Sequence, residues 1–462
     1  MERRTFLKGL LPISLSLLLH CQKTRRSPNI VLIVFDAVRA DHTSAWGYGL
    51  DTTPNLSQFL RTSTKYSWAY ATAPWTLPSH ASMFTGLFAF EHGAHTVLDA
   101  SKGEVAEIAL SETIPTAAQI LAAKGYATAG YCASTNPPGF LGERWGLGRG
   151  FETYRLLSNQ SEGTRAAEDA LYPEIMNWIR GQSDRPYFLF VNIRDAHTPY
   201  NLTLPPGVSF PPASRDANLP FQLKEAVASG SGSIDRRLIE EVTKQYDLGV
   251  YNADRALGLL LKGLQDSGHF DNSLIIVTSD HGEYLGEHHL AIHGQDVHEA
   301  VIRVPLAVKL VNQSAAMQVH TPASLVQIFP SMMAAAGIYR PDLKPFLGAR
   351  QNPPIIAEEY YARAIEFKHP VAGKRFRRIR TAYIEWPWKL IHSTDGLHEL
   401  YNIEEDALEV NDCLQAEPVR VASMMERLAA IKPGNQAPTS PSQEVPELTE
   451  EEKKALKSEG YL

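Results

Sequence analysis

Cysteine is scarce in this chain, with three residues in 462, and Cys132 and Cys413 lie far apart. This number gives no disulfide framework, so the fold must depend on a hydrophobic core. Positive charge is not in excess either, because 44 lysines and arginines stand against 51 acidic residues and the net charge is −7. This balance gives no indication of a nucleic-acid partner, and we expect none.

Long apolar runs are absent after the N-terminal segment, so we expect no later membrane span. Residues 1–27 have the pattern of a twin-arginine export signal, with the pair Arg3-Arg4 followed by an apolar run over 10–19. Cys21 follows that run, where a lipoprotein would be cleaved and lipidated. We predict an exported protein of the periplasm or cell envelope, and membrane attachment through a lipidated Cys21 stays an open alternative.

The length and composition are those of an ordinary globular protein with a large core, at 44% hydrophobic and 21% charged residues. No internal repeat is visible. We predict a large domain over residues 28–340, a small C-terminal subdomain over 341–431 and a polar tail over 432–462. The stretch 204–233 is rich in proline, glycine and serine, which predicts a mobile surface insertion and a candidate lid.

Three continuous apolar runs are typical of strands that are buried on both faces of a parallel sheet. They cover residues 30–35, 187–193 and 274–279, and they end at Asp36, near Asp195 and at Asp280. Helical patterns lie between them, including one capped by Thr113 and one over 246–261, so we predict an α/β sandwich with a mostly parallel sheet. Short strands over 381–385 and 388–391 predict a small antiparallel C-terminal sheet.

Thr76 opens a short segment with helical signals, because Pro78 suits a first turn and Gly86 suits a helix end. Unpaired N–H groups and the helix dipole would favour an anion at Thr76. Two interpretations follow from the segment alone. Thr76 is either a covalent nucleophile or the cap of its helix.

Asp280 and His281 directly follow the third predicted strand, and a carboxylate and an imidazole there can reach one divalent ion. Asp36 ends another strand, and two buried carboxylates near one another are costly without a cation. We predict a metal held by Asp36, Asp280 and His281, with the Thr76 oxygen as a further ligand. A metal lowers the pKa of a bound hydroxyl group and makes it a usable nucleophile.

Several ordered motifs resemble the sulfatases of the alkaline phosphatase superfamily, over roughly residues 28–412. The motifs lie at residues 29–42, 53–56, 78–86, 195–200, 278–283 and 399–402. The resemblance implies an alkaline-phosphatase-like sandwich, a metal-binding first strand, a nucleophile at Thr76, and a small-molecule, glycan or lipid ester as substrate.

The residue at the nucleophile position departs from the family. Family sulfatases carry a Cys or Ser that is oxidised to formylglycine, whereas this chain has Thr76, so no formylglycine is expected. Threonine at this place resembles the phosphoethanolamine and phosphoglycerol transferases of the superfamily and some of its phosphatases. In those enzymes the threonine attacks phosphorus and a phospho-threonine intermediate forms.

Three further departures from the family concern residues expected near the nucleophile and the metal. His80 replaces an arginine that helps to hold the nucleophile, Ala37 replaces a second calcium-binding aspartate, and Gln295 takes the place of a sulfate-contacting lysine. We place His80 with the catalytic residues and Gln295 with the substrate-binding ones. The loss of a carboxylate shifts the expected metal from calcium toward manganese or zinc.

The resemblance also assigns roles to two histidines. It implies that His197 contacts the ester oxyanion and that His293 protonates the departing oxygen. Asp195, His197 and His293 also supply the residue types of a second metal site, which we favour less. Asp195 and Arg39 are placed with the substrate-binding residues, and capping of the first strand turn is the alternative for Arg39.

Together these features predict an exported, metal-dependent, sulfatase-like hydrolase that cleaves a sulfate or phosphate ester through Thr76. One alternative is a phosphoryl transferase that passes a phosphoryl group from Thr76 to an acceptor hydroxyl. Another is a non-catalytic, metal-stabilised protein that binds anionic glycans.

Overall fold

The computed structural model describes residues 27–99, 103–134, 139–158, 171–182, 184–200, 202–204, 207–230, 234–339, 344–346, 354–362, 364–432 and 449–450. The predicted export signal through residue 26, including Cys21, and most of the predicted tail therefore lie outside the described residues. In the described part of the chain, the helices are too short or too polar for a membrane crossing.

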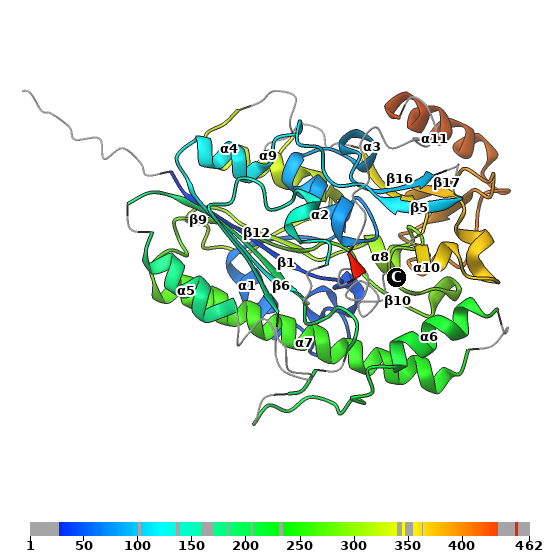
Figure 1. The fold of residues 1–462 in the computed structure, drawn as a ribbon, viewed down its shortest axis with the longest axis horizontal. Helices are drawn as coiled ribbons and strands as arrows, with labels where there is room; N and C mark the ends of the chain where they lie inside the picture. The colour runs from blue at the N-terminus through cyan, green and yellow to red at the C-terminus, as the bar shows by residue number, and fades with distance from the viewer. Residues whose placement is uncertain are drawn as a thin grey trace, which may run out of the picture.

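A large, mostly parallel sheet forms the centre of the protein (Figure 1). Its eight strands, in spatial order, are β13 (Met317–Val319), β2 (Thr64–Tyr66), β12 (Leu306–Lys309), β9 (Ser273–Ser279), β1 (Asn29–Phe35), β8 (Tyr187–Ile193), β6 (Ala127–Ser134) and β7 (Thr153–Ser158). The strands from β9 to β7 run parallel, whereas β12 is antiparallel to both of its neighbours. The predicted α/β sandwich is confirmed.

The three predicted strands are β1, β8 and β9, and every residue in them is buried. Strand β1 lies between the other two, with Phe35 beside Ile193 on one side and beside Ser279 on the other. Because all three strands run parallel, their carboxyl ends meet at one edge of the sheet. This register brings Asp36 next to Asp280.

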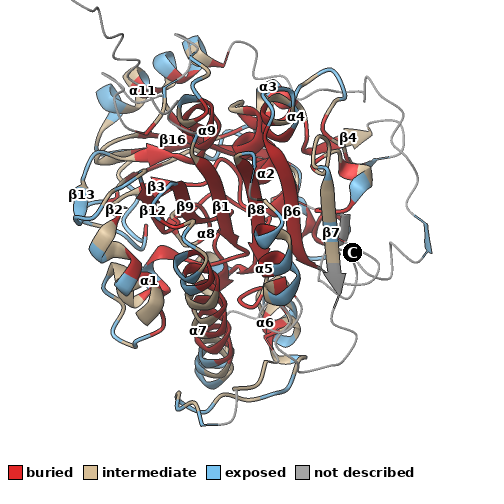
Figure 2. Ribbon diagram, turned by 90° about the vertical axis from the view of Figure 1, so that its left-hand side faces the viewer, coloured by how far each residue is buried: buried red, intermediate tan, exposed pale blue. Residues whose placement is uncertain are grey.

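Helices cover both faces of the sheet, whose central strands are red in Figure 2. Alternate residues of β1 point to opposite cores, so that Ile30 and Leu32 face one side and Val31 and Ile33 the other. The first side is covered by α2 (Thr76–Thr85), α4 (Ala117–Ala123) and α9 (Ile328–Ala335), and the second by α1 (Pro54–Phe59), α5 (Tyr172–Arg180) and α7 (Arg236–Asp266).

Two predicted helices have boundaries that differ from the expectation. Thr116 rather than Thr113 caps α4, because its side chain accepts a hydrogen bond from the Gln119 N–H and the Gln119 side chain accepts one from the Thr116 N–H. The helix predicted over 246–261 is the 31-residue α7, which begins after the side-chain cap Asp235. Its amino-terminal part is more polar, and the apolar pattern alone did not reveal it.

The predicted antiparallel C-terminal sheet is confirmed. It has four strands, β15 (Ile355–Tyr360), β16 (Ile379–Glu385), β17 (Trp388–Ser393) and β18 (Glu399–Asn402), and α11 (Pro418–Ile431) packs on β16 and β17. The shorter elements are β3 (Ala69–Tyr70), α3 (Ala89–His92), β4 (Thr96–Asp99), β5 (Glu104–Glu107), β10 (Tyr284–Leu285), β11 (Ala291–Ile292), α8 (Glu299–Ile302), β14 (Ala323–Ser324) and α10 (Ala364–Phe367).

The stretch predicted as an irregular insertion contains a helix, α6 (Leu219–Ala228). Leu223 and Pro220 are buried, and the helix packs against α7 and β11. The composition concealed this helix, because prolines and glycines lie on both sides of it in the sequence. Residues 205–206 and 231–233 of the stretch lie outside the described residues.

Candidate active site

Asp36, Asp280 and His281 form a buried group at the carboxyl edge of the central sheet. Each offers one ligand atom, and these atoms all lie within 4.8 Å of one another. Asp36 is 4% exposed, and the other two side chains are fully buried. Adjacent parallel strands therefore bring together the three predicted metal-binding side chains.

The orientation of His281 suits a metal ligand. Its Nδ1 lies 2.8 Å from the Gly282 carbonyl oxygen, which can only accept, so Nδ1 carries a proton. In the neutral ring the Nε2 lone pair then faces Asp36 Oδ1 at 3.6 Å and Asp280 Oδ2 at 3.5 Å. A lone pair that faces two carboxylate oxygens is favourable only with a cation between them.

Asp280 gives a second test of the fit to a cation. Its Oδ1 accepts hydrogen bonds from the main-chain N–H groups of Ala37 and His281, whereas its Oδ2 accepts none from the part of the chain that the structure describes. Burial and then the neighbouring Asp36 raise the pKa of Asp280 well above its usual value. These ligand atoms fit a divalent ion, whose charge would offset the cost of burying two neighbouring carboxylates.

Thr76 is the first residue of helix α2, and its hydroxyl faces the same group. Trp75 occupies the cap position, so the interpretation of Thr76 as the helix cap is wrong. Thr76 Oγ1 lies 3.4 Å from His281 Nε2. Helix α2 ends at Gly86 with a φ of 74°, as predicted, and points the positive end of its dipole toward Thr76.

Two side chains of α2 fix the position of Thr76 at the carboxyl edge of the central sheet. Ser79 donates a hydrogen bond to the Asp280 carbonyl oxygen at 2.6 Å, and His80 Nδ1 donates to the Thr76 carbonyl oxygen at 2.9 Å. His80 is fully buried against Phe84 and Phe190, and burial lowers its pKa to about 4. The structure thus places neutral His80 as a positioning residue rather than the predicted catalytic one.

His293 lies beside His281 and is held by a carboxylate that sequence reasoning did not assign. The two imidazole ring centroids are 4.4 Å apart. His293 Nδ1 lies 2.6 Å from Glu283 Oε1, and Tyr200 donates a hydrogen bond to the other oxygen of Glu283. Glu283 follows Asp280 by three residues in the same motif, which is the sequence signal that could have identified it.

His197 also lies beside His293, with ring centroids 4.9 Å apart. Its Nδ1 lies 2.7 Å from the Thr198 carbonyl oxygen and 3.0 Å from Arg194 Nη2. Burial and then Arg194 lower the pKa of His197 well below its usual value. The neutral ring with a proton on Nδ1 presents a lone pair at Nε2. Arg194, which sequence reasoning did not assign, adds a positive charge beside this ring.

The remaining predicted residues occupy different surroundings. Asp195 is buried at the end of β8, and its carbonyl packs so closely on α7 that a Cβ at Gly249 would lie 2.5 Å from it. Gln295 accepts a hydrogen bond from the Ala291 N–H at 3.3 Å and lines a neighbouring cavity. Gln295 follows His293 by two residues, and its side chain lines this cavity.

Arg39 does not have the surroundings expected of a substrate-binding residue. Its guanidinium forms ion pairs with Asp41 and Glu287 at 2.7 and 2.6 Å and donates to the Glu283 carbonyl oxygen. Burial disfavours its charge, but Asp41 and Glu287 outweigh that effect and keep its pKa well above the usual value. Arg39 therefore links the turn after β1 to the segment after β9.

Comparisons with known proteins agree with this geometry. The Sulfatase family pattern matches residues 28–338. The uncharacterized sulfatase YidJ of Escherichia coli is 22% identical over 87% of this chain and 86% of its own. An N-acetylglucosamine-6-O-sulfatase of Bacteroides thetaiotaomicron is 23% identical over 87% of this chain and 86% of its own.

Solved structures share the fold. The phosphonate monoester hydrolase of Agrobacterium radiobacter superposes with a TM-score of 0.64 at 17% identity, and the match covers 88% of this chain and 95% of that one. The family pattern spans more than half of the chain, including the site residues from Asp36 to Gln295. The chain belongs to the sulfatase family of the alkaline phosphatase superfamily and has the sulfatase fold.

Proposed function

We propose that this protein is a metal-dependent hydrolase of sulfate or phosphate esters with Thr76 as its nucleophile. One observation carries the proposal. The Thr76 hydroxyl stands at the start of a buried helix, 3.4 Å from His281 Nε2, and so adjoins the Asp36, Asp280 and His281 group. A hydroxyl in this place has both a cation site and a helix N-terminus beside it.

The expected cofactor is one divalent ion of manganese, zinc or calcium, held by Asp36, Asp280 and His281 with the Thr76 oxygen. When bound, such an ion lowers the pKa of a neighbouring hydroxyl and neutralises part of the charge of the ester. A mixed set of carboxylates and an imidazole favours manganese or zinc over calcium.

The reaction then proceeds in two steps. Thr76 Oγ attacks sulfur or phosphorus and loses its proton to water, while the bond to the leaving oxygen breaks. That oxygen takes a proton from His293, whose second proton is stabilised by the Glu283 carboxylate. Water then cleaves the Thr76 ester, and Thr76 and His293 regain their protons.

Two different observations support two classes of ester, a sulfate ester and a phosphorus ester. The name of the relative from Bacteroides thetaiotaomicron supports a sulfate ester on a sugar. A threonine nucleophile and the phosphonate monoester hydrolase neighbour support a phosphorus ester. A small-molecule, glycan or lipid ester fits either class.

The decisive experiment compares Thr76→Ala with Thr85→Ala, a matched threonine at the other end of α2 whose hydroxyl bonds the Ala81 carbonyl. The substrates are aryl sulfate, aryl phosphate, phosphodiester and phosphonate esters, with manganese, zinc or calcium. We expect Thr76→Ala to lose about a thousandfold or more in kcat while it retains metal, and Thr85→Ala to change little.

Other outcomes separate the alternatives. Undiminished turnover in Thr76→Ala would falsify the nucleophile assignment. Product transfer to an added alcohol in place of water would favour the phosphoryl transferase, and bound metal without turnover of any ester would favour the binding protein. The accurate mass of the trapped Thr76 peptide distinguishes a phosphoryl from a sulfuryl group.

We also propose that the protein is exported, on the strength of the pattern in residues 1–27. A twin-arginine signal depends on both arginines, so the double replacement of Arg3→Lys and Arg4→Lys should leave the protein in the cytoplasm. Cell fractionation with an antibody to a C-terminal tag measures this. Unchanged export of the double variant would contradict the twin-arginine assignment.

A further inference from the structure

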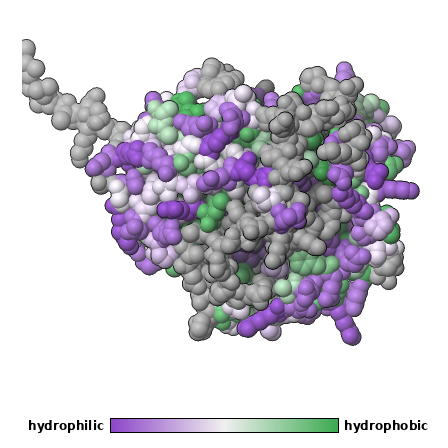
Figure 3. Space-filling model, in the orientation of Figure 1, coloured by the Kyte–Doolittle hydropathy of each residue, from purple (hydrophilic) through white to green (hydrophobic). Residues whose placement is uncertain are grey.

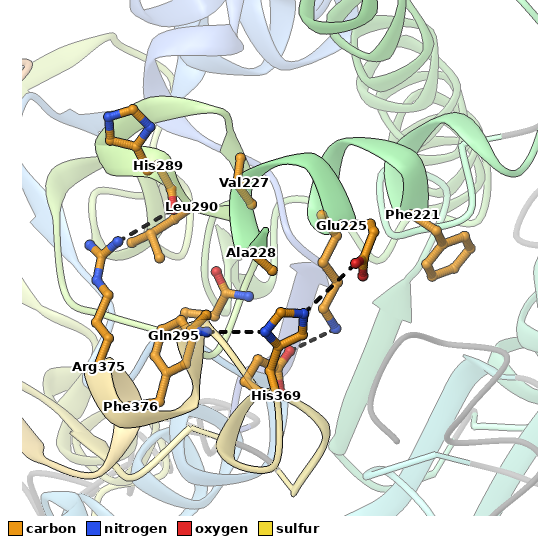
Figure 4. A pocket seen from close by; sticks show the side chains of 13 residues that line it. Phe221, Glu225, Val227, Ala228, His289, Leu290, Gln295, His369, Arg375 and Phe376 are labelled. Atoms are coloured by element: carbon orange, nitrogen blue, oxygen red, sulfur yellow. Dashed lines mark hydrogen bonds and ion pairs between the residues drawn. The ribbon is translucent and has the colours of Figure 1, made fainter. Parts of the chain in front are cut away.

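A cavity of about 300 Å³ lies beside the candidate active site, and its walls come from three separate segments. Helix α6 supplies Phe221, Val227 and Ala228, the residues before β11 supply Leu290, and the short helix over 372–376 supplies Phe376 (Figure 4). These side chains are apolar or aromatic. The space has the size and lining of a site for a small organic group.

Surface composition agrees with this lining. Hydrophilic side chains cover much of the coloured face in Figure 3, and a pale green, hydrophobic group interrupts them where Figure 1 places α6. Helix α6 thus presents apolar side chains beside the C-terminal subdomain. The helix belongs to the stretch whose composition suggested a lid.

The charged side chains in the wall already have partners. Lys224 Nζ forms an ion pair with Glu366 Oε1 at 2.7 Å, and His369 Nε2 faces Glu225 Oε1 at 3.8 Å. Arg375 donates hydrogen bonds to the carbonyl oxygens of the segment 288–289. Since each of these charged side chains already has a polar partner within the protein, an uncharged group is the better occupant of the cavity.

One short segment joins this cavity to the reacting groups. Leu290 and Gln295 line the cavity, and His293 lies between them in the sequence. The Gly294 N–H donates a hydrogen bond to the Pro74 carbonyl oxygen at 3.0 Å, just before Thr76. Figure 4 shows Gln295 among the side chains that line the cavity.

We propose that this cavity binds an uncharged, apolar or aromatic group on the leaving oxygen of the ester. The proposal rests on the function proposed above, because His293 would protonate that oxygen and belongs to the segment that forms the cavity wall. The cavity then selects esters of bulky hydrophobic alcohols over esters of small alcohols. Helix α6 is the element that gives this selectivity.

The test fills the cavity and compares two esters of the same acid, one of 2-naphthol and one of ethanol. Ala228→Trp places an indole in the space, and Gln222→Trp puts the same side chain at an exposed position of α6 outside the lining. We expect Ala228→Trp to raise KM for the naphthyl ester about tenfold or more and to leave the ethyl ester nearly unchanged. Gln222→Trp should alter neither value.

Direct binding separates this proposal from the proposed function. In calorimetry, free 2-naphthol should bind the wild-type protein and the Thr76→Ala variant, and its affinity should fall about tenfold in Ala228→Trp. Naphthol binding that the variant weakens, in a protein that cleaves no ester, would support the cavity and contradict the function. Ester turnover with equal effects of Ala228→Trp on both esters, or with none, would overturn the cavity proposal.

A second variant protects the test against misfolding. Val227→Phe adds less bulk to the same wall and should give the same selective effect, smaller in size. Thermal unfolding of each variant identifies those that fold. If both folded variants bind 2-naphthol as the wild type does, the cavity is not its binding site and the proposal fails.

Discussion

Asp280 and Asp296 are both fully buried, but different groups surround their carboxylates. Arg380 Nε lies 2.8 Å from Asp296 Oδ1, and Arg378 Nη2 lies 3.1 Å from the other oxygen. Burial raises the pKa of Asp296, but Arg380 and other positive groups outweigh it and hold that pKa well below its usual value. Around Asp280, burial and then Asp36 raise the pKa instead.

The difference separates a structural charge from a functional one. Arg378 and Arg380 come from the C-terminal subdomain, so their ion pairs with Asp296 join that subdomain to the central domain. Among the described residues, the basic side chains beside the Asp280 carboxylate are the imidazoles of His80 and His281, which are not permanent cations. A buried carboxylate with this partner set must receive its full positive charge from outside the chain.

The largest effect expected from this comparison is that of Asp280→Asn, which keeps the side-chain size. We expect loss of the bound metal and a fall in kcat of about a thousandfold or more, because one ligand charge is removed. In the metal-free protein the same change should raise the melting temperature, because it removes repulsion with Asp36. Metal analysis, kinetics and calorimetry in chelator measure these effects.

Asp296→Asn is the matched control for that variant. In the metal-free protein, Asp280→Asn should raise the melting temperature and Asp296→Asn should lower it. A metal-free Asp280→Asn protein that melts below the wild type would break the comparison. Full activity in Asp280→Asn with metal retained would also contradict the assignment of Asp280 as a ligand.

The second effect is the loss of stability in Asp296→Asn. Removal of the Asp296 charge leaves Arg380 with Glu399 and Arg378 with Asp395, both more exposed than Asp296. Because the buried partner is lost, we expect a loss of about 3 kcal/mol in the free energy of unfolding at pH 7. Urea denaturation measures it. Metal content should stay at the wild-type level, because Asp296 lies outside the metal-binding group.

The pH dependence of this loss has a defined sign. A carboxyl whose pKa is lower in the folded than in the unfolded state stabilises the fold above the unfolded value and loses that contribution as the pH falls. The wild type should therefore lose its advantage over Asp296→Asn below about pH 4, the usual aspartate pKa. An advantage that grows as the pH falls would contradict the ion-pair interpretation.

The same contrast explains how much of the molecule could be predicted from sequence. The strands β1, β8 and β9 are continuous buried runs, and parallel register then places Asp36 beside Asp280 without further information. The helix predicted at Thr76 is also present. Thr76 is its first residue, and the extended backbone of Trp75 gives that residue the cap position, which the sequence alone does not show.

Residues whose roles depend on distant partners were harder to predict. Arg39 was assigned to substrate, although Glu287, far along the chain, takes up its charge. His80 was assigned to catalysis, although aromatic rings enclose it. Local motifs name residue types, but only tertiary packing decides which of them face a ligand and which are enclosed by the core.

The smallest of these effects concerns Glu283, a third buried carboxylate of the same region. Its partner is the imidazole of His293, which can gain or lose a proton, whereas Asp296 has permanent cations and Asp280 adjoins another carboxylate, Asp36. We expect Glu283→Gln to lower kcat about ten- to a hundredfold for esters of poor leaving groups, since His293 loses the charge that orients it and stabilises its second proton. Aryl esters with good leaving groups need little proton donation and should be affected less.

Tyr200→Phe provides the matched control for Glu283→Gln, because it removes a hydrogen bond to the same carboxylate and leaves the charge in place. A charge effect moves the basic limb of the pH–rate profile to lower pH in Glu283→Gln and leaves it nearly in place in Tyr200→Phe. Equal loss of rate for good and poor leaving groups, with an unmoved pH profile, would mean that Glu283 only supports packing. In that case its carboxylate would belong with Asp296 as a structural charge, and proton donation to the leaving oxygen would need another group.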